Sequence, residues 1–215
     1  MTIKCIIIDL GDVIFDLDFS QFFNEVITPS PLNKPKTPIM LEFFRQSDTY
    51  HQGKISDKEF YNQACELLRV CDLNQKAFYG AFNSIISEIN LEMVELVKNI
   101  RRNNQLKIIC LSNINSSHWK YIKKKWGSEI WGSEPKKSPL FDKFILSHKV
   151  HLTKPDIKIF EIAIQKAGCN PEEIVFIDDG LNNIRAASEL GINGIRFVGI
   201  DELTKSLKEL NINID

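Results

Sequence analysis

The sequence predicts an α/β fold, with a parallel sheet flanked by helices and a small all-helical segment inserted after the first strand. Two observations lead to this prediction. Short apolar runs rich in β-branched residues recur along the chain, and from residue 91 they alternate with helical patterns. Such alternation is typical of right-handed βαβ units in a parallel sheet. From residue 19 to residue 88 the patterns are helical only, which indicates an insertion.

The predicted strands are short and apolar, as strands buried on both faces of a sheet are. They cover residues 5–8, 107–111, 144–146, 174–177 and 194–198. Amphipathic patterns predict core helices over residues 91–101, 156–167, 182–190 and 202–210. Gly168 and Gly191 follow two of these helices and are placed to terminate them.

The inserted segment carries four helical patterns, over residues 19–27, 39–44, 56–70 and 77–86. Ser56 is a plausible N-cap, and Glu59 three residues later completes a capping box. Residues 28–38 contain four prolines and are predicted to be a surface loop rather than a helix.

Composition indicates an ordinary globular protein. The 27 basic and 28 acidic residues nearly cancel, so neither a nucleic-acid nor a membrane partner is expected. The five cysteines are scattered without zinc-site spacing, which favours a reducing, cytoplasmic compartment. A signal peptide is not expected, because the first strand begins within a few residues of Met1.

Polar residues follow three of the predicted strands: Asp9, the pair Ser112 and Asn113, and the pair Asp178 and Asp179. The carboxyl ends of parallel strands share one edge, so these side chains can converge there. A buried carboxylate is costly without a cation, although Asp9 could instead only cap the next turn.

Lys154 adds a cation to this predicted edge. Pro155 favours an extended conformation for Lys154 and can occupy the first turn of the next helix, which would bring the ammonium to the crevice. Several carboxylates with few other ligands suit Mg²⁺. Asp9 would then be an oxygen nucleophile for phosphoryl transfer, with Ser112, Asn113 and Lys154 holding the phosphoryl oxygens.

The chain resembles the haloacid dehalogenase-like hydrolase superfamily over nearly its whole length. Its four matching segments are IIIDLGDVI, IICLSNIN, KPDIKIFEIAI and VFIDDGLNNIRAASELGI. The DLGxVI form and GKISDKEF look most like the bacterial α-glucose-1-phosphatase branch, related to the phosphatase domain of soluble epoxide hydrolases. The resemblance implies a Rossmann-like core of residues 1–18 and 89–215 and a helical cap of residues 19–88.

The resemblance also implies roles for individual residues. Asp9 would be the nucleophile and a Mg²⁺ ligand, together with the carbonyl of Gly11 and Asp179. Asp178 would act on the metal indirectly, by holding the direct ligands or through a water molecule. Asn183 would support the fourth segment and the phosphate site. Residues 13–18 would form a mobile flap next to the cap.

One position departs from most phosphatases of this superfamily. Their acid/base aspartate two residues after the nucleophile is Gly11 here, and losing positioned proton transfer costs about 10²–10⁴-fold in rate. Asp12 could substitute, although a turn-capping role is favoured. Slow turnover is therefore expected, best on esters with good leaving groups such as sugar 1-phosphates or acyl phosphates.

The sequence thus predicts a Mg²⁺-dependent phosphatase for a small phosphorylated metabolite, acting as a monomer or homodimer. Two alternatives stay open: a binding protein without turnover, suggested by Gly11, and a haloacid dehalogenase, in which Asp9 would attack carbon. The acidic pair at residues 178–179 argues against the dehalogenase, whose chemistry needs no metal.

Two further features of the sequence each allow two interpretations. Residues 118–143 are rich in lysine and tryptophan, a pattern found in single-strand nucleic-acid sites, but Tyr121, Ile122 and Trp126 are expected to pack under a helix instead. His148 and His151 precede Lys154, and a loop position without a role is favoured over substrate contact.

Overall fold

In the part of the chain that the structure describes, five parallel strands form the central sheet, in the order β5-β4-β1-β6-β7. This is a computed structural model that describes residues 2–70, 73–131 and 138–214. The strands are β1 (Cys5–Ile8), β4 (Lys107–Ser112), β5 (Lys143–Leu146), β6 (Ile174–Asp178) and β7 (Asn193–Arg196). Every pairing in this sheet is parallel. The predicted α/β fold is therefore confirmed, with small shifts at the strand ends.

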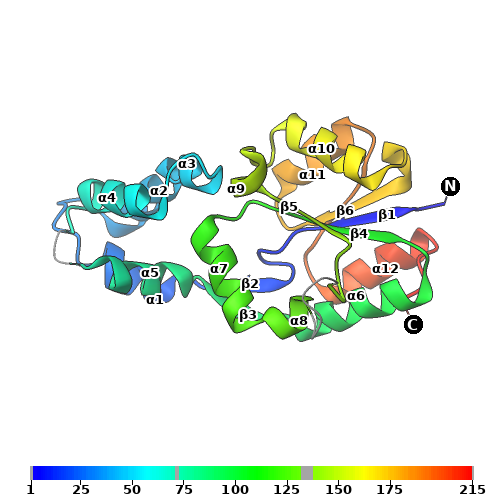
Figure 1. Ribbon diagram of the computed structural model, residues 1–215, viewed down its shortest axis with the longest axis horizontal. Coiled ribbons are helices and arrows are strands. Elements are labelled where there is room, and N and C mark those ends of the chain that lie inside the picture. Colours follow the sequence, from blue (N-terminus) through cyan, green and yellow to red (C-terminus); the bar gives the residue numbers. More distant parts are fainter. Residues whose placement is uncertain (1, 71–72, 132–137, 215) are drawn as a thin grey trace.

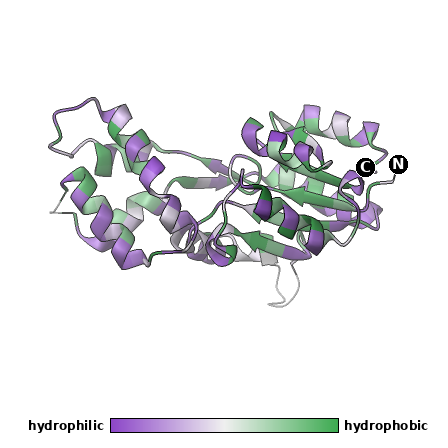
Figure 2. Ribbon diagram, turned by 90° about the horizontal axis from the view of Figure 1, so that it is seen from above, coloured by the Kyte–Doolittle hydropathy of each residue, from purple (hydrophilic) through white to green (hydrophobic). Residues whose placement is uncertain are grey.

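Helices cover both faces of the sheet (Figure 1). Successive residues of a strand point to opposite faces, so Ile6 and Ile8 belong to one core and Cys5 and Ile7 to the other. The first face is covered by helices α6 (Leu91–Asn103), α7 (Ser116–Lys125), α8 (Gly127–Trp131) and α12 (Ile200–Glu209). The second face is covered by α10 (Ile157–Ala167) and α11 (Leu181–Glu189). Figure 2 shows the strands as the most hydrophobic part of this sandwich.

Local sequence signals set several helix ends as predicted. Gly168 ends α10 in the left-handed region, with φ +71°. Ser56 accepts a hydrogen bond from the Glu59 amide, and the Glu59 side chain accepts one from the Ser56 amide in return. The capping box is thus present. Pro155, however, precedes α10 instead of occupying its first turn, because Asp156 takes the N-cap position.

The inserted segment folds beside the sheet around its own core (Figure 1). Its helices are α1 (Ser20–Phe22), a π-helical turn (Phe23–Ile27), α2 (Lys36–Gln46), α3 (Asp48–His51), α4 (Asp57–Leu68) and α5 (Gln75–Asn83). The core is aromatic: Tyr50 stacks on Phe60 with ring centroids 4.1 Å apart, and Phe78 on Phe82 at 5.8 Å. We propose that residues 19–88 form a cap, and residues 1–18 and 89–215 the core.

A two-stranded antiparallel sheet joins the cap to the core, and the sequence did not predict it. It consists of β2 (Phe15–Leu17) and β3 (Ile86–Ile89). The predicted helix over residues 77–86 is therefore wrong at its end. The expected loop over residues 28–38 is also too long, since Pro38 lies in the first turn of α2, where a missing N–H is tolerated.

Candidate functional site

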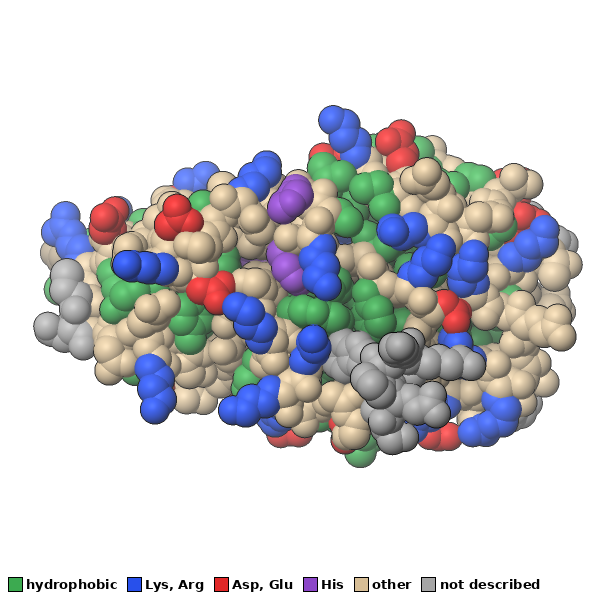
Figure 3. Space-filling view, in the orientation of Figure 1, with side chains coloured by type: hydrophobic (Ala, Val, Ile, Leu, Met, Phe, Trp, Pro, Cys, Tyr) green, Lys and Arg blue, Asp and Glu red, His purple; other side chains and the backbone are tan. Residues whose placement is uncertain are grey.

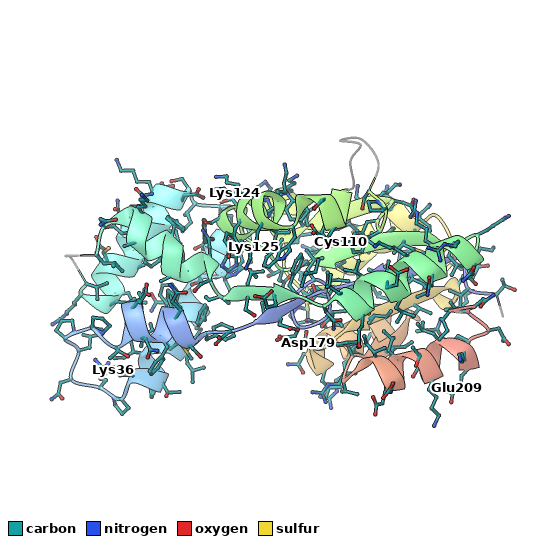
Figure 4. All side chains as sticks on the ribbon, turned by 90° about the horizontal axis from the view of Figure 1, so that it is seen from below. Lys36, Cys110, Lys124, Lys125, Asp179 and Glu209 are labelled. Carbon is teal, nitrogen blue, oxygen red and sulfur yellow. The ribbon has the colours of Figure 1, made fainter. Side chains whose placement is uncertain are left out.

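Three strand ends meet at the edge of the sheet that faces the cap. Asp9 follows β1, Ser112 ends β4 and Asp178 ends β6. Residue Ile8 pairs with both neighbouring strands, so Asp9 lies between their ends. Asp9, Ser112 and Asp178 are all buried. Figure 4 shows Asp179 at this end of the core, next to the cap.

A buried ammonium group lies between two of these carboxylates. The Lys154 Nζ is 2.9 Å from Asp9 Oδ1 and 2.5 Å from Asp178 Oδ2, and it also donates to the Leu111 carbonyl. Burial raises the pKa of Asp9 to about 6, although Lys154 opposes that shift. Burial lowers the pKa of Lys154, but the two carboxylates outweigh it and raise that pKa overall. The lysine is thus held charged beside Asp9.

The two adjacent aspartates have different surroundings. Asp178 is fully buried, and its Oδ1 accepts hydrogen bonds from the Gly180 amide at 2.9 Å and the Asn183 side chain at 2.8 Å. Its other oxygen binds Lys154, so protein donors occupy both. Asp179 is half-buried, and burial together with the nearby Asp178 raises its pKa. Asp179 therefore has the less occupied carboxylate.

These side chains fit a divalent cation. One oxygen each of Asp9, Asp178 and Asp179 lies within 4.8 Å of the others. The buried Asp9 Oδ1 has the Lys154 ammonium 2.9 Å away and no other polar partner among the described residues. Carboxylate oxygens are the hard, negatively charged ligands that Mg²⁺ prefers.

The loop after β4 is tied to Lys154. The Asn113 side chain donates to the Lys154 carbonyl and accepts from the Lys154 amide, each at 2.8 Å. Asn115 then caps α7 by accepting from the His118 amide at 2.9 Å. The helix begins at Ser116, so its N-terminus lies directly after the candidate phosphate-binding residues.

Gly11 and Asp12 lie in the tight turn that leads from Asp9 into β2. Asp12 adopts φ 50°, and its Oδ1 accepts a hydrogen bond from the Leu17 amide at 3.2 Å. The Asp12 carboxylate thus supports the turn. An added Cβ at Gly11 would meet the Leu17 side chain at 3.3 Å, so β2 closes over the position of the usual acid/base residue.

A pocket of about 150 Å³ opens beside Gly11, Ser112 and Asn113. Its wall combines core and cap residues and is mostly apolar. The remaining lining residues are Leu10, Phe15, Leu17, Phe19, Phe44, His51, Ile85, Ile86, Ile114, His118 and Ile122. His51 and His118 also line the pocket, which the sequence does not predict. No local signal could have identified them, because they come together only through cap–core packing.

The lysine- and tryptophan-rich segment reaches this pocket through His118 and Ile122, whereas His148 and His151 do not line it. Trp126 and Ile122 are buried, and Trp126 packs on Phe15 with ring centroids 5.0 Å apart, so the expected packing is confirmed. The lysines at positions 136 and 137 lie outside the described residues. His148 and His151 each place Nδ1 within 2.8 Å of a backbone carbonyl. Figure 3 shows histidines at the surface where cap and core meet.

Residues 3–191 match the haloacid dehalogenase-like hydrolase family. The chain belongs to this family. The match spans most of the core together with the whole inserted segment, in agreement with the four resembling segments of the sequence. The protein is accordingly a haloacid dehalogenase-like hydrolase.

Two proteins with similar sequences differ in the share of their own length that this chain covers. D-ribitol-5-phosphate phosphatase from Bacteroides thetaiotaomicron is 29% identical over 196 residues, which are 88% of this chain and 89% of that protein. Drimenol cyclase from Aspergillus calidoustus is 25% identical over 210 residues. That match covers 97% of this chain, but the chain spans only 36% of the cyclase.

Solved structures agree with the fold. A haloacid dehalogenase-family enzyme from Bacteroides thetaiotaomicron, in complex with magnesium and inorganic phosphate, is 28% identical with a TM-score of 0.75, covering 90% of this chain and 93% of that one. L-2-haloacid dehalogenase from Xanthobacter autotrophicus has a TM-score of 0.58 at 15% identity, covering 98% of this chain and 84% of that one, which shows a shared fold alone.

The helices of the described residues were also compared with the length and hydropathy that a membrane span requires, and none of them meets both requirements.

Proposed function

We propose that this hydrolase is a Mg²⁺-dependent phosphatase that removes the phosphoryl group of a small phosphorylated metabolite through Asp9. The observation that carries the proposal is the buried Lys154, paired with Asp9 and Asp178 at the edge where Ser112 and Asp179 also lie. A lysine is costly to bury, and here its position suits an anionic substrate beside an oxygen nucleophile. The phosphatase among the relatives and the neighbour with magnesium and phosphate support the same reaction.

The chain's own residues account for most of the chemistry. An Asp9 oxygen attacks phosphorus, the bond from phosphorus to the alcohol oxygen breaks, and the leaving alkoxide takes a proton from water. Water then attacks the phosphorus of the aspartyl-phosphate, releasing inorganic phosphate and a proton and restoring the Asp9 carboxylate. Lys154, Ser112 and the amides of the loop at Asn113 stabilise the phosphoryl oxygens in both steps.

Mg²⁺ would be held by Asp9, Asp179 and the Gly11 carbonyl, and it would neutralise charge on the phosphoryl oxygens. Asp178 would act indirectly, because protein donors already occupy its oxygens. With glycine at position 11, no carboxylate from that residue can protonate the leaving group. Slow turnover on poor leaving groups follows.

The test is hydrolysis of p-nitrophenyl phosphate with and without Mg²⁺, comparing wild type with Asp9→Asn. Activity should require Mg²⁺ and disappear in the variant. The matched control is Asp16→Asn, which removes an exposed carboxylate from the same segment and should keep wild-type activity. Activity that survives in Asp9→Asn would refute the proposed nucleophile.

Two alternatives would give different results. A binding protein would be stabilised by Mg²⁺ with beryllofluoride yet hydrolyse no ester. A dehalogenase would release halide from 2-chloropropionate without any metal. Either result would replace the phosphatase proposal.

A further inference from the structure

The pocket beside the proposed phosphate site is the next part of the molecule that a substrate would meet. It shares Ser112 and Asn113 with that site and extends between β2, β3 and the cap. Its volume is about 150 Å³. Protein cavities of about that size, when lined by apolar side chains, stay dry and bind benzene. The pocket therefore fits a group no larger than about one aromatic ring.

The hydrogen bonds of His51 and His118, the two histidines that line the pocket, indicate that both imidazole rings are neutral. His118 places Nε2 2.9 Å from the Phe82 carbonyl, so that nitrogen carries the proton, and Nδ1 accepts from the Asn115 side chain at 3.1 Å. His51 repeats this arrangement, with Nδ1 3.0 Å from the Ser47 carbonyl and Nε2 3.5 Å from the same Asn115 amide group. Burial lowers the pKa of both rings.

The other polar side chains that line the pocket are Asn113 and Ser112. Both ends of the Asn113 amide bind the Lys154 backbone, and Ser112 belongs to the proposed phosphate site. With both imidazoles neutral, the described residues that line the pocket carry no formal charge. The hydroxyl groups of a sugar or polyol would lose water here and find few free partners, which is unfavourable.

We propose that the substrate is a phosphate monoester of a small apolar alcohol, aryl or branched alkyl, rather than of a polyol. This inference rests on the phosphatase function proposed above and specifies its substrate class. It departs from the activity named for the relative that is 29% identical, D-ribitol-5-phosphate phosphatase. The apolar group would lie against Phe44 of the cap and Leu17 and Ile86 of the two-stranded sheet.

The test compares butyl phosphate with erythritol 4-phosphate in the presence of Mg²⁺. Both are primary four-carbon esters, so they differ mainly in hydroxyl groups. An apolar pocket discriminates by about 10²-fold per unmatched group, so kcat/KM for butyl phosphate should be higher by about 10²-fold or more. Equal values, or a preference for erythritol 4-phosphate, would overturn the inference.

A variant of the pocket wall tests whether the preference for butyl phosphate over erythritol 4-phosphate depends on Phe44. Phe44→Gln should narrow the ratio of the two kcat/KM values, because the new amide offers partners to hydroxyl groups. Leu41→Gln is the matched control: it lies on the same helix, is 62% exposed and does not line the pocket, so the ratio should stay at the wild-type value. A wild-type ratio in Phe44→Gln would contradict the proposed position of the alcohol.

Hydrolysis of p-nitrophenyl phosphate separates the two proposals. If wild type hydrolyses it with Mg²⁺ but prefers the polyol ester, the substrate class is wrong and the phosphatase function stands. If it hydrolyses none of the three esters, the phosphatase function fails, and the substrate class fails with it.

Discussion

His118 links the core to the cap, and its burial should make the stability of the protein depend on pH. The side chain is on α7, is 7% exposed, and stacks on Phe82 of α5 with ring centroids 4.4 Å apart. Burial, together with the nearby His51, lowers the pKa of His118 from 6.5 to about 3, although the Phe82 carbonyl opposes the shift. The folded chain therefore keeps this ring neutral over a range where the unfolded chain binds a proton.

The difference between the pKa of His118 in the folded and in the unfolded chain sets the sign and the size of the effect of pH on stability. A lowered folded-state pKa gives stability that is complete above pH 6.5 and is lost as the pH falls from there toward 3. At pH 5 the unfolded state gains about 2 kcal/mol from protonation at this site. That amount is a large fraction of the free energy of unfolding of an ordinary domain.

The perturbation is His118→Gln, and the assay is urea unfolding at pH 7.5 and pH 5. Glutamine can still donate to the Phe82 carbonyl, but it does not titrate. The stability advantage of wild type over the variant should shrink by about 2 kcal/mol between pH 7.5 and pH 5. The measurement at pH 7.5 gives the packing cost of the substitution by itself. An advantage that stays constant across the two pH values would refute the reasoning.

Three variants at the edge of the sheet give the remaining predictions. Gly11→Asp should raise kcat on alkyl phosphates by about 10²-fold, because the new carboxyl group restores proton transfer to a poor leaving group. On p-nitrophenyl phosphate, whose leaving group is good, kcat should change little. The new side chain would displace only the flexible tip of Leu17. Steady-state kinetics on both esters measures this, and an equal gain on both would rule out a proton-transfer role. Asp179→Asn should weaken Mg²⁺ binding by at least about tenfold in calorimetry and leave metal-free stability nearly unchanged. Asp178→Asn should instead cost about 3 kcal/mol of metal-free stability, because it breaks the buried pair with Lys154; equal stability losses in the two variants would contradict their different environments.

The sequence by itself determined the sheet and the residues at its edge. Buried strands such as residues 5–8 and 174–177 are recognisable from composition alone, and Gly168 ends its helix because only a residue tolerant of positive φ fits there. Once the strands are known to be parallel, their carboxyl ends must share an edge. The strand patterns therefore predict that Asp9 and Asp178 can meet at one edge, whereas their actual contact through Lys154 depends on β1 lying beside β6 in the folded sheet.

Only the tertiary structure decided how the cap meets the core. The pairing of β2 with β3 joins residues distant in sequence, and Ile86–Ile89 has a helical pattern before it and no turn signal to mark it as a strand. His51 and Asn115 are 64 positions apart in the sequence, yet they are in contact beside the pocket. Local patterns report periodicity within an element, whereas the shape and polarity of this pocket arise from packing between elements. For that reason the sequence predicts the polar residues at the sheet edge, and only the folded chain shows the pocket beside them.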